Sequence, residues 1–203
     1  MDRLTERLHR APRVLRPRVW KTLARFVTVP ENDLFWSFME RWETNHYLDQ
    51  PVPWWTPGSI EELAAQQLRG MRALEWGAGA STLWLLRQGC QVTSIETDEG
   101  WADLVRRRGG AALDLRLAAH GSDDFLPEVR GYGLAIIDSE RRVDVSRHLL
   151  DGKFDGLVVW DDSERARYRE GILALGEKAR RQLHFPGLQP RATPKMTSLF
   201  WMA

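Results

Sequence analysis

Short apolar runs that alternate with helical patterns constrain the fold of this chain more than any other feature of its sequence. The strand candidates are residues 73–76, 92–96, 113–118, 134–138 and 157–160. The expected helices that precede, separate or follow them are residues 59–70, 82–87, 101–108, 143–149 and 164–179. Short buried strands that alternate with helices are typical of a parallel sheet covered on both faces. Two more strand-like segments, 182–187 and 196–203, predict a terminal hairpin and seven strands in all.

The charge of the chain is uneven, and this suggests two parts. The chain carries +1 in total and its first 25 residues carry +6, so the remaining residues sum to −5. We predict a basic helical N-terminal extension over 1–50, with one helix near 34–42, and a single domain over 51–203. The extension could pair two chains into a homodimer or touch an acidic surface; the alternative is a solvated helix broken at Pro12 and Pro17. The acidic balance of the rest argues against a nucleic-acid partner.

Composition also indicates where the protein works. No apolar run reaches the length of a transmembrane segment, and the first twenty residues lack the apolar centre of a secretion signal. The lone cysteine, Cys90, allows no internal disulfide and is compatible with a reducing compartment. The predicted location is therefore cytoplasmic.

The stretch RALEWGAGASTLWLLRQG, residues 72–89, places a glycine turn between the first strand and its helix. Gly77 and Gly79 permit a tight turn, and the helix that follows points its free amides at any bound carboxylate or phosphate. A dinucleotide fingerprint needs a third glycine at position 82, which is Thr82 here. Glu96 ends the second strand, 19 residues after Gly77, where an acid accepts hydrogen bonds from ribose hydroxyls. Ribose binding alone does not separate NAD from S-adenosylmethionine (SAM).

Five segments together resemble the motifs of class I SAM-dependent methyltransferases. They are LEWGAGASTLWL, VTSIETDEGW, GYGLAIIDSERR, GKFDGLVVWDDSERARY and TSLFWM, in the order of the family's strands. The resemblance covers about residues 50–203 and departs at Ser81, where many members carry a glycine. It implies an α/β fold with a Rossmann-like, mostly parallel, doubly wound sheet. It also implies transfer of a methyl group from SAM to an oxygen or nitrogen of a small-molecule acceptor.

The resemblance assigns cofactor-binding residues position by position. The backbone of the loop at Gly77, Ala78, Gly79 and Ser81 would hold the methionine end of SAM. Glu75 would orient this loop or the amino group of the cofactor, and Glu96 would hold the ribose with Thr97 and Asp98 nearby. Ser122 or Asp123 would border the adenine, and Asp138 is also a cofactor-binding candidate. Each acid has a simpler alternative: Glu75 caps the turn, Asp98 caps the helix after it, and Asp123 caps a short turn.

Three aspartates follow the fourth and fifth strands and would meet at one edge of the sheet. Asp138, Asp161 and Asp162 would contact the acceptor and, by resemblance to catechol-type and macrocin-type O-methyltransferases, hold Mg²⁺. The alternative is that Asp161 and Asp162 cap the next helix and Asp138 binds the substrate without metal. Catechol-type members have a lysine base three residues after the first Asp, where this chain has Arg141. An arginine stays protonated, so we expect Arg141 or its neighbour Arg142 to clamp an acidic substrate.

Other residues complete the candidate site. Asp138, Asp161 and His120 are the catalytic candidates, with His120 as a base or, alternatively, as an exposed loop histidine. Trp54 and Trp55 would stack on a planar acceptor or simply pack in the core. Two further functions stay open: an NAD- or nucleotide-binding oxidoreductase, and a SAM-binding partner protein without catalysis.

Overall fold

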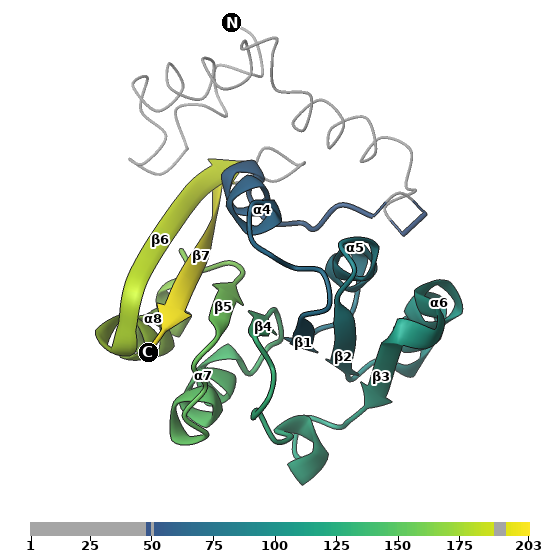
Figure 1. The fold of residues 1–203 in the computed structure, drawn as a ribbon. Helices are drawn as coiled ribbons and strands as arrows, with labels where there is room; N and C mark the ends of the chain where they lie inside the picture. Colours follow the sequence, from purple (N-terminus) through teal and green to yellow (C-terminus); the bar gives the residue numbers. More distant parts are fainter. Residues whose placement is uncertain (1–47, 50, 189–193) are drawn as a thin grey trace, which may run out of the picture. The chain divides into compact units, whose positions relative to one another are not determined.

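The computed structural model describes residues 48–49, 51–188 and 194–203, which form a seven-stranded sheet with helices on both faces (Figure 1). The strands are β1 (Arg72–Trp76), β2 (Gln91–Glu96), β3 (Leu113–Leu117), β4 (Leu134–Ile137), β5 (Leu157–Trp160), β6 (Ala179–Leu188) and β7 (Pro194–Met202). The α-helices are α4 (Pro57–Ala64), α5 (Ala80–Arg87), α6 (Glu99–Gly109), α7 (Arg142–Asp151) and α8 (Arg169–Lys178). The 3-10 turns are η2 (Gly110–Ala112), η3 (Asp123–Phe125) and η4 (Ala166–Tyr168).

The predicted basic extension, its helix near 34–42 and the proposed homodimer contact lie outside the described residues, apart from 48 and 49 at the end of that extension. In the part that is described, no helix has the length and apolar character needed to cross a bilayer.

The strand order confirms the predicted α/β class. It runs β3-β2-β1-β4-β5-β7-β6, with β1 to β5 parallel and β7 antiparallel to both of its neighbours. The chain therefore winds outward from β1 in one direction and then returns to β4 to wind in the other. Such a reversal leaves a crevice at the carboxyl ends of β1 and β4, which is where ligands bind in this kind of sheet.

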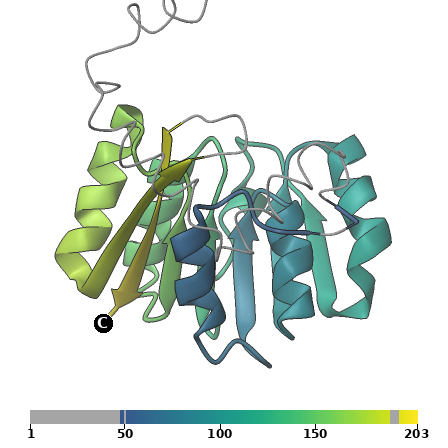
Figure 2. The ribbon, with the colours of Figure 1, turned by 90° about the horizontal axis from the view of Figure 1, so that it is seen from above.

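Successive residues of each central strand pack into two different cores, as the alternation of side chains across a sheet requires. Leu74 and Trp76 of β1 belong to the core that includes residues of α7 and α8. Ala73 belongs to the other, which includes residues of α4 and α5. Figure 2 shows α4 and α5 in front of the strands. Because both faces are covered, the strands read as continuous apolar runs in the sequence.

The helices differ from the predicted ranges at several ends. The largest difference at a carboxyl end is in the first helix, which ends at Ala64 rather than at residue 70. Two starts differ for local reasons. The first helix begins at Pro57 rather than Ser59, since proline is favoured in a first turn and the Ser59 hydroxyl donates to the Thr56 carbonyl at 2.7 Å. The last helix was expected from residue 164 but begins at Arg169. Residues 164–168 instead form a turn that includes η4. The residue before them, Ser163, anchors this turn to β7, because its backbone N donates to the Met196 carbonyl at 2.9 Å.

Two glycines of α8 give a matched test of this packing. A β-carbon at Gly171 would lie 2.5 Å from the buried ring of Trp160 and 2.6 Å from Ser146 Oγ, whereas one at Gly176 would meet only the end of the Gln182 side chain. We expect Gly171→Ala to lower the free energy of unfolding by roughly 1–3 kcal/mol through overpacking. Gly176→Ala should be neutral or stabilising by up to about 1 kcal/mol, through helix propensity. Urea unfolding of both variants checks this, and equal effects would contradict the packing described.

Candidate functional site

Two adjoining cavities lie in the crevice at the carboxyl ends of the parallel strands. The aspartate cavity, of about 350 Å³, is lined by the glycine loop, Asp138, Asp161, Asp162 and Lys195, among others. The Glu96 cavity, of about 300 Å³, is lined by the same loop together with Glu96, His120 and Phe125. Gly77, Ala78 and Asp138 line both cavities. The two cavities are therefore the halves of one cleft, with the glycine loop and Asp138 where they meet.

Glu75 lies beneath the glycine loop and does not line either cavity. Its side chain is fully buried and accepts hydrogen bonds from three hydroxyl groups: Ser81 Oγ at 2.5 Å, Thr82 Oγ1 at 2.5 Å and Ser94 Oγ at 2.9 Å. These contacts join the start of α5 and the neighbouring strand β2 to the end of β1. They are the contacts of a residue that orients the loop, rather than of one that touches a cofactor.

Thr82 shows why the third glycine of the dinucleotide fingerprint is absent. Its hydroxyl accepts a hydrogen bond from Gly79 N at 2.8 Å and donates one to Glu75. A glycine at this position would offer neither contact. The sequence departure is thus a different way of fixing the turn, in which a side chain of α5 ties the loop amide to a buried acid.

Burial raises the pKa of Glu75 to about 7, although the hydroxyl groups of Ser81, Thr82 and Ser94 favour its ionised form and lower it in part. The carboxyl group therefore takes up a proton near neutral pH. In either protonation state it retains oxygen atoms that can accept hydroxyl donors.

The two glycines of the loop serve different purposes. Gly77 has a φ of +98°, and a β-carbon there would lie 2.4 Å from the carbonyl oxygen of Asp138. Gly79 has an extended φ of 172°, and a β-carbon there would touch only Trp101, at 3.8 Å or more. Trp101 also holds the loop directly, because its Nε1 donates to the Ala78 carbonyl at 2.6 Å. Gly77 is thus required by the backbone, whereas Gly79 leaves space in the cleft.

Glu96 is held at the end of β2 by backbone amides. Its carboxylate accepts from Ala78 N at 3.1 Å, Thr97 N at 2.6 Å and Asp98 N at 3.0 Å. Thr97 lines the same cavity. Asp98 instead caps α6, accepting from Trp101 N at 2.7 Å, as the simpler interpretation of this residue predicted.

The Glu96 cavity is lined by two rings and not by the predicted Asp123. His120 and Phe125 line it, with ring centroids 5.6 Å apart. Asp123 is exposed at the start of η3, and Ser122 Oγ donates to the Ala119 carbonyl; neither lines the cavity. His120 also lines the opposite half of the cleft from Asp161, so its placement favours an exposed loop histidine over a base at the acceptor.

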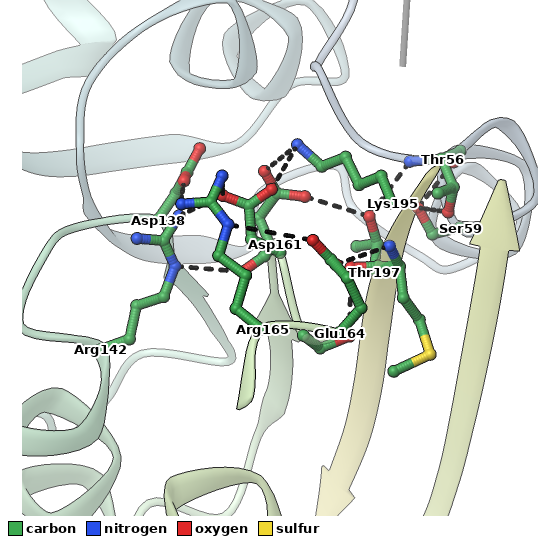
Figure 3. Close-up of polar contacts among 12 residues, drawn as sticks. Thr56, Ser59, Asp138, Arg142, Asp161, Glu164, Arg165, Lys195 and Thr197 are labelled. Atoms are coloured by element: carbon green, nitrogen blue, oxygen red, sulfur yellow. Dashed lines mark hydrogen bonds and ion pairs between the residues drawn. The ribbon is translucent and has the colours of Figure 1, made fainter. Parts of the chain in front are cut away.

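The three aspartates do come together, as the sequence predicts. One carboxylate oxygen from each of Asp138, Asp161 and Asp162 lies within 4.8 Å of the other two. Figure 3 shows Asp138 and Asp161 on neighbouring strand ends. Asp161 and Asp162 are buried, and the side chain of Asp138 is 30% exposed. The alternative that Asp161 and Asp162 cap the next helix is wrong, because α8 begins at Arg169 and its N-cap is Tyr168.

Every carboxylate of this cluster is already paired with a cation of the protein. Arg142 Nη2 binds Asp138 Oδ1 and lies 3.2 Å from Asp162 Oδ2. Lys195 Nζ lies 2.5 Å from Asp161 Oδ2 and 3.3 Å from Asp162 Oδ1, and Arg165 binds Asp162 Oδ2 at 2.6 Å. Three carboxyl groups therefore face three basic side chains, an arrangement different from an acidic cage that needs an ion for neutrality.

The arginines do not behave as a clamp for an acidic substrate. Arg142 is buried, and its Nε donates to the Asp161 carbonyl at 3.0 Å and its Nη1 to Tyr168 Oη at 3.2 Å. Arg141 pairs with Asp144 at 2.9 Å. Both guanidinium groups are engaged within the protein, so their contacts give no support to the expectation that Arg141 or Arg142 clamps an acidic substrate.

Burial and mutual repulsion shape the acid–base behaviour of the cluster. Burial raises the pKa of Asp138 to about 6, against the attraction of Arg142 and Lys195. Burial, with repulsion from Asp138, raises the pKa of Asp161 to about 8. For Lys195, burial disfavours the charged form, but the carboxylates of Asp161, Asp162 and Asp138 outweigh it and raise the pKa. Lys195 is therefore an ammonium at neutral pH.

Lys195 is a residue of this site that the sequence analysis did not predict. Lys195 was overlooked because a lone lysine before a terminal strand resembles a solvated residue; its only signal is its place near the start of an expected strand. The two tryptophans, predicted either to stack on the acceptor or to pack in the core, lie in different surroundings. Trp55 is 1% exposed in the core, whereas Trp54 lines the aspartate cavity.

Solved structures similar to this one carry the same fold. The O-methyltransferase TomG from Streptomyces achromogenes, involved in tomaymycin synthesis and solved with SAM, is 14% identical, with a TM-score of 0.56 over 90% of this chain and 96% of that one. An O-methyltransferase from Bacillus cereus, solved with SAH, is 16% identical, with a TM-score of 0.55 over 86% and 93%. An rRNA methylase from Streptococcus thermophilus is 14% identical, with a TM-score of 0.51 over 71% and 95%.

No protein-family model matches the sequence, and no curated protein matches it either. At the identities of the solved structures, the likeness shows the fold alone. The chain has the fold of class I SAM-dependent methyltransferases, as its motifs led us to expect.

The two loop glycines give a direct test of the turn. We expect Gly77→Ala to lower the free energy of unfolding by roughly 2–4 kcal/mol, because it combines a positive φ with a clash against the Asp138 carbonyl. Gly79→Ala, two residues away, should change it by less than about 1 kcal/mol, since its backbone is extended and its surroundings open. Chemical denaturation measures both. A Gly77→Ala variant as stable as Gly79→Ala would contradict this geometry.

Glu75 should make stability depend on pH. Because its pKa is raised from 4.5 to about 7 on folding, its contribution to stability is complete below pH 4.5 and is lost as the pH rises through 7. Glu75→Gln removes this titration. The free energy of unfolding of the variant minus that of the wild type should therefore rise by about 3 kcal/mol across this range. Urea unfolding at several pH values measures it, and a constant difference would refute the shift.

Proposed function

We propose that this protein transfers a methyl group from SAM to an oxygen of a small-molecule acceptor. One observation carries the proposal, which is that the two halves of the site form a single cleft. One half contains the glycine loop and Glu96, and the other contains the aspartates and Lys195, with Asp138 lining both. Similar solved structures bound to SAM and SAH support this choice of cofactor. No observation on the molecule favours the NAD-dependent oxidoreductase or the inactive partner protein.

The cofactor would lie across both halves of the cleft. The backbone at Gly77–Ser81 and the start of α5 would hold the methionine end, and Glu96 with Thr97 the ribose. The rings of Phe125 and His120 would border the adenine in place of Asp123. This assignment uses the groups that line the cleft, and it places the sulfonium near the junction at Asp138.

The acceptor would enter the aspartate cavity, where Trp54 offers an aromatic wall. The reaction is an in-line displacement in which the acceptor oxygen bonds to the methyl carbon, the bond from carbon to sulfur breaks, and the hydroxyl proton leaves. Alignment of the two reactants is the main contribution of such an enzyme. Asp138 would take the proton, since it is the most exposed of the three carboxylates. Asp161 has both oxygens occupied by Lys195 and Thr197 and would act by positioning Lys195.

The size of the aspartate cavity, about 350 Å³, favours a small molecule over a nucleic acid or a protein. Thermal shift and calorimetry with SAM, SAH and NAD test the cofactor, and labelled SAM with panels of hydroxylated and amine acceptors tests the reaction. SAM and SAH should raise the melting temperature, and NAD should leave it unchanged. Stabilisation by NAD without stabilisation by SAM would overturn the proposal.

Glu96 gives a sharper prediction for cofactor binding. Glu96→Gln should weaken SAM binding tenfold or more, about 1.4 kcal/mol, because a neutral amide accepts hydroxyl donors less strongly than a carboxylate. Glu99→Gln, on the exposed first turn of α6, is the matched control and should leave the affinity unchanged. Isothermal titration calorimetry measures both. Equal affinities in the two variants would exclude Glu96 from the ribose site.

A further inference from the structure

The aspartate cavity contains an ammonium group that is almost completely buried. The side chain of Lys195 is 4% exposed, and its Nζ lies 2.5 Å from Asp161 Oδ2 and 3.3 Å from Asp162 Oδ1 (Figure 3). Lysine is almost never buried to this degree unless it is paired. Lys195 nevertheless lines the cavity, so its ammonium group borders the space in which the acceptor would bind.

The surroundings of Lys195 fix its position. Asp161 is held from its other side by Thr197, whose hydroxyl donates to Oδ1 at 3.1 Å and accepts from Thr56 N at 3.1 Å. Asp162 adopts a left-handed backbone with a φ of 57°, which is uncommon for a residue other than glycine and occurs at functional sites. Both carboxylates that receive the ammonium are therefore held in place by the fold.

The other two cations of the cluster differ from Lys195. Arg142 is locked by its bonds to the Asp161 carbonyl and Tyr168, away from any ligand. Arg165 reaches Asp162 from the rim, with 42% of its side chain exposed. Lys195 alone among the three combines a buried charge with a place at the cavity wall. A divalent ion bound to these carboxylates would have to displace this ammonium or lie against it.

The Mg²⁺ site that the resemblance implies therefore does not fit the residues present. We propose that Lys195 is the resident cation of the acceptor site, where its ammonium replaces a divalent metal and donates a hydrogen bond to the acceptor oxygen. This inference rests on the proposed methyl transfer. The ammonium has three N–H groups. One of them donates to Asp161 Oδ2, and the contact with Asp162 Oδ1 at 3.3 Å takes at most a second, which leaves at least one for a ligand in the cavity.

This arrangement also selects the atom that is methylated. A hydroxyl or phenolate oxygen has a second lone pair, which accepts from Lys195 while the first attacks the methyl group. A neutral amine has one lone pair and uses it in the attack, so it gains nothing from the ammonium. Lys195 therefore favours oxygen over nitrogen as the acceptor.

Metal binding to the wild-type protein is the first test. Manganese is the probe, because a free Mn²⁺ ion and a bound one differ in their electron paramagnetic resonance signal. With SAH present, we expect no bound Mn²⁺ and no change in melting temperature at millimolar concentration, and no loss of methyl transfer on adding EDTA. Saturable Mn²⁺ binding in the micromolar range, or loss of activity with EDTA, would overturn the proposal.

Removal of the ammonium is the second test. Lys195→Ala should lower the melting temperature, because it leaves the buried Asp161 without its cation and removes one of the three cations around Asp162. Mn²⁺ should restore part of this loss by entering the vacated position. Lys178→Ala, an exposed lysine at the end of α8, is the control and should show neither effect. If Mn²⁺ fails to stabilise Lys195→Ala more than wild type, the ammonium does not occupy a cation site. If Lys195→Ala does not fold, Lys195→Gln replaces it in this test. The Mn²⁺ binding measurement on the wild-type protein needs neither variant.

The products of methyl transfer are the third test. Wild-type protein should place the methyl group on oxygen, and Lys195→Met should reduce the rate at least a hundredfold with SAM affinity within twofold of wild type. Products methylated on nitrogen, or an unchanged rate in Lys195→Met, would contradict the inference. Failure of SAM to bind would instead remove the proposed function, and the Mn²⁺ measurements would still decide whether Lys195 is the resident cation.

Discussion

The cleft depends on the hydrogen bonds that the carboxyl group of Glu75 accepts beneath the glycine loop. Hydroxyl groups from α5 and from β2 converge on it, so one acid joins the loop, the helix and the neighbouring strand. Thr82 extends this network to the amide of Gly79. The loop therefore has a defined shape without any ligand, and a ligand that binds there needs little further ordering.

The carboxyl group beneath the glycine loop and the carboxyl groups of the aspartate cavity are stabilised in different ways. At Glu75 the charge is met by hydroxyl groups and partly removed by protonation. At the aspartate cavity it is met by two arginines and Lys195, which themselves would be costly to bury alone. The first arrangement fixes the backbone of the turn. The second leaves charged groups along the wall of the cavity, where they can act on a bound molecule.

Several features of the site were predictable from the sequence because they depend on local order. An acid at the end of a buried strand must lie at the sheet edge, so Glu96, Asp138 and Asp161 were placed there correctly. The side of the sheet on which each residue packs follows from alternation along a strand. Contacts between the ends of loops do not follow such a rule. Asp123 was assigned from the resemblance and His120 from its place after the third strand; in the structure Asp123 is exposed and does not line the cleft, and His120 lines the half opposite the acceptor.

The sequence by itself determined the order of strands and helices, the glycine turn and the meeting of three aspartates, because periodicity and parallel strand ends are local properties. Only the tertiary structure decided which cation faces those aspartates. Lys195 follows Asp161 by 34 residues and reaches it through the antiparallel pairing of β5 with β7, in which Trp160 lies opposite Ser198. That register places Thr197 and Lys195 beside the end of β5. A shift of one residue would turn the lysine to the other face of the sheet, and no local pattern in the sequence specifies the register.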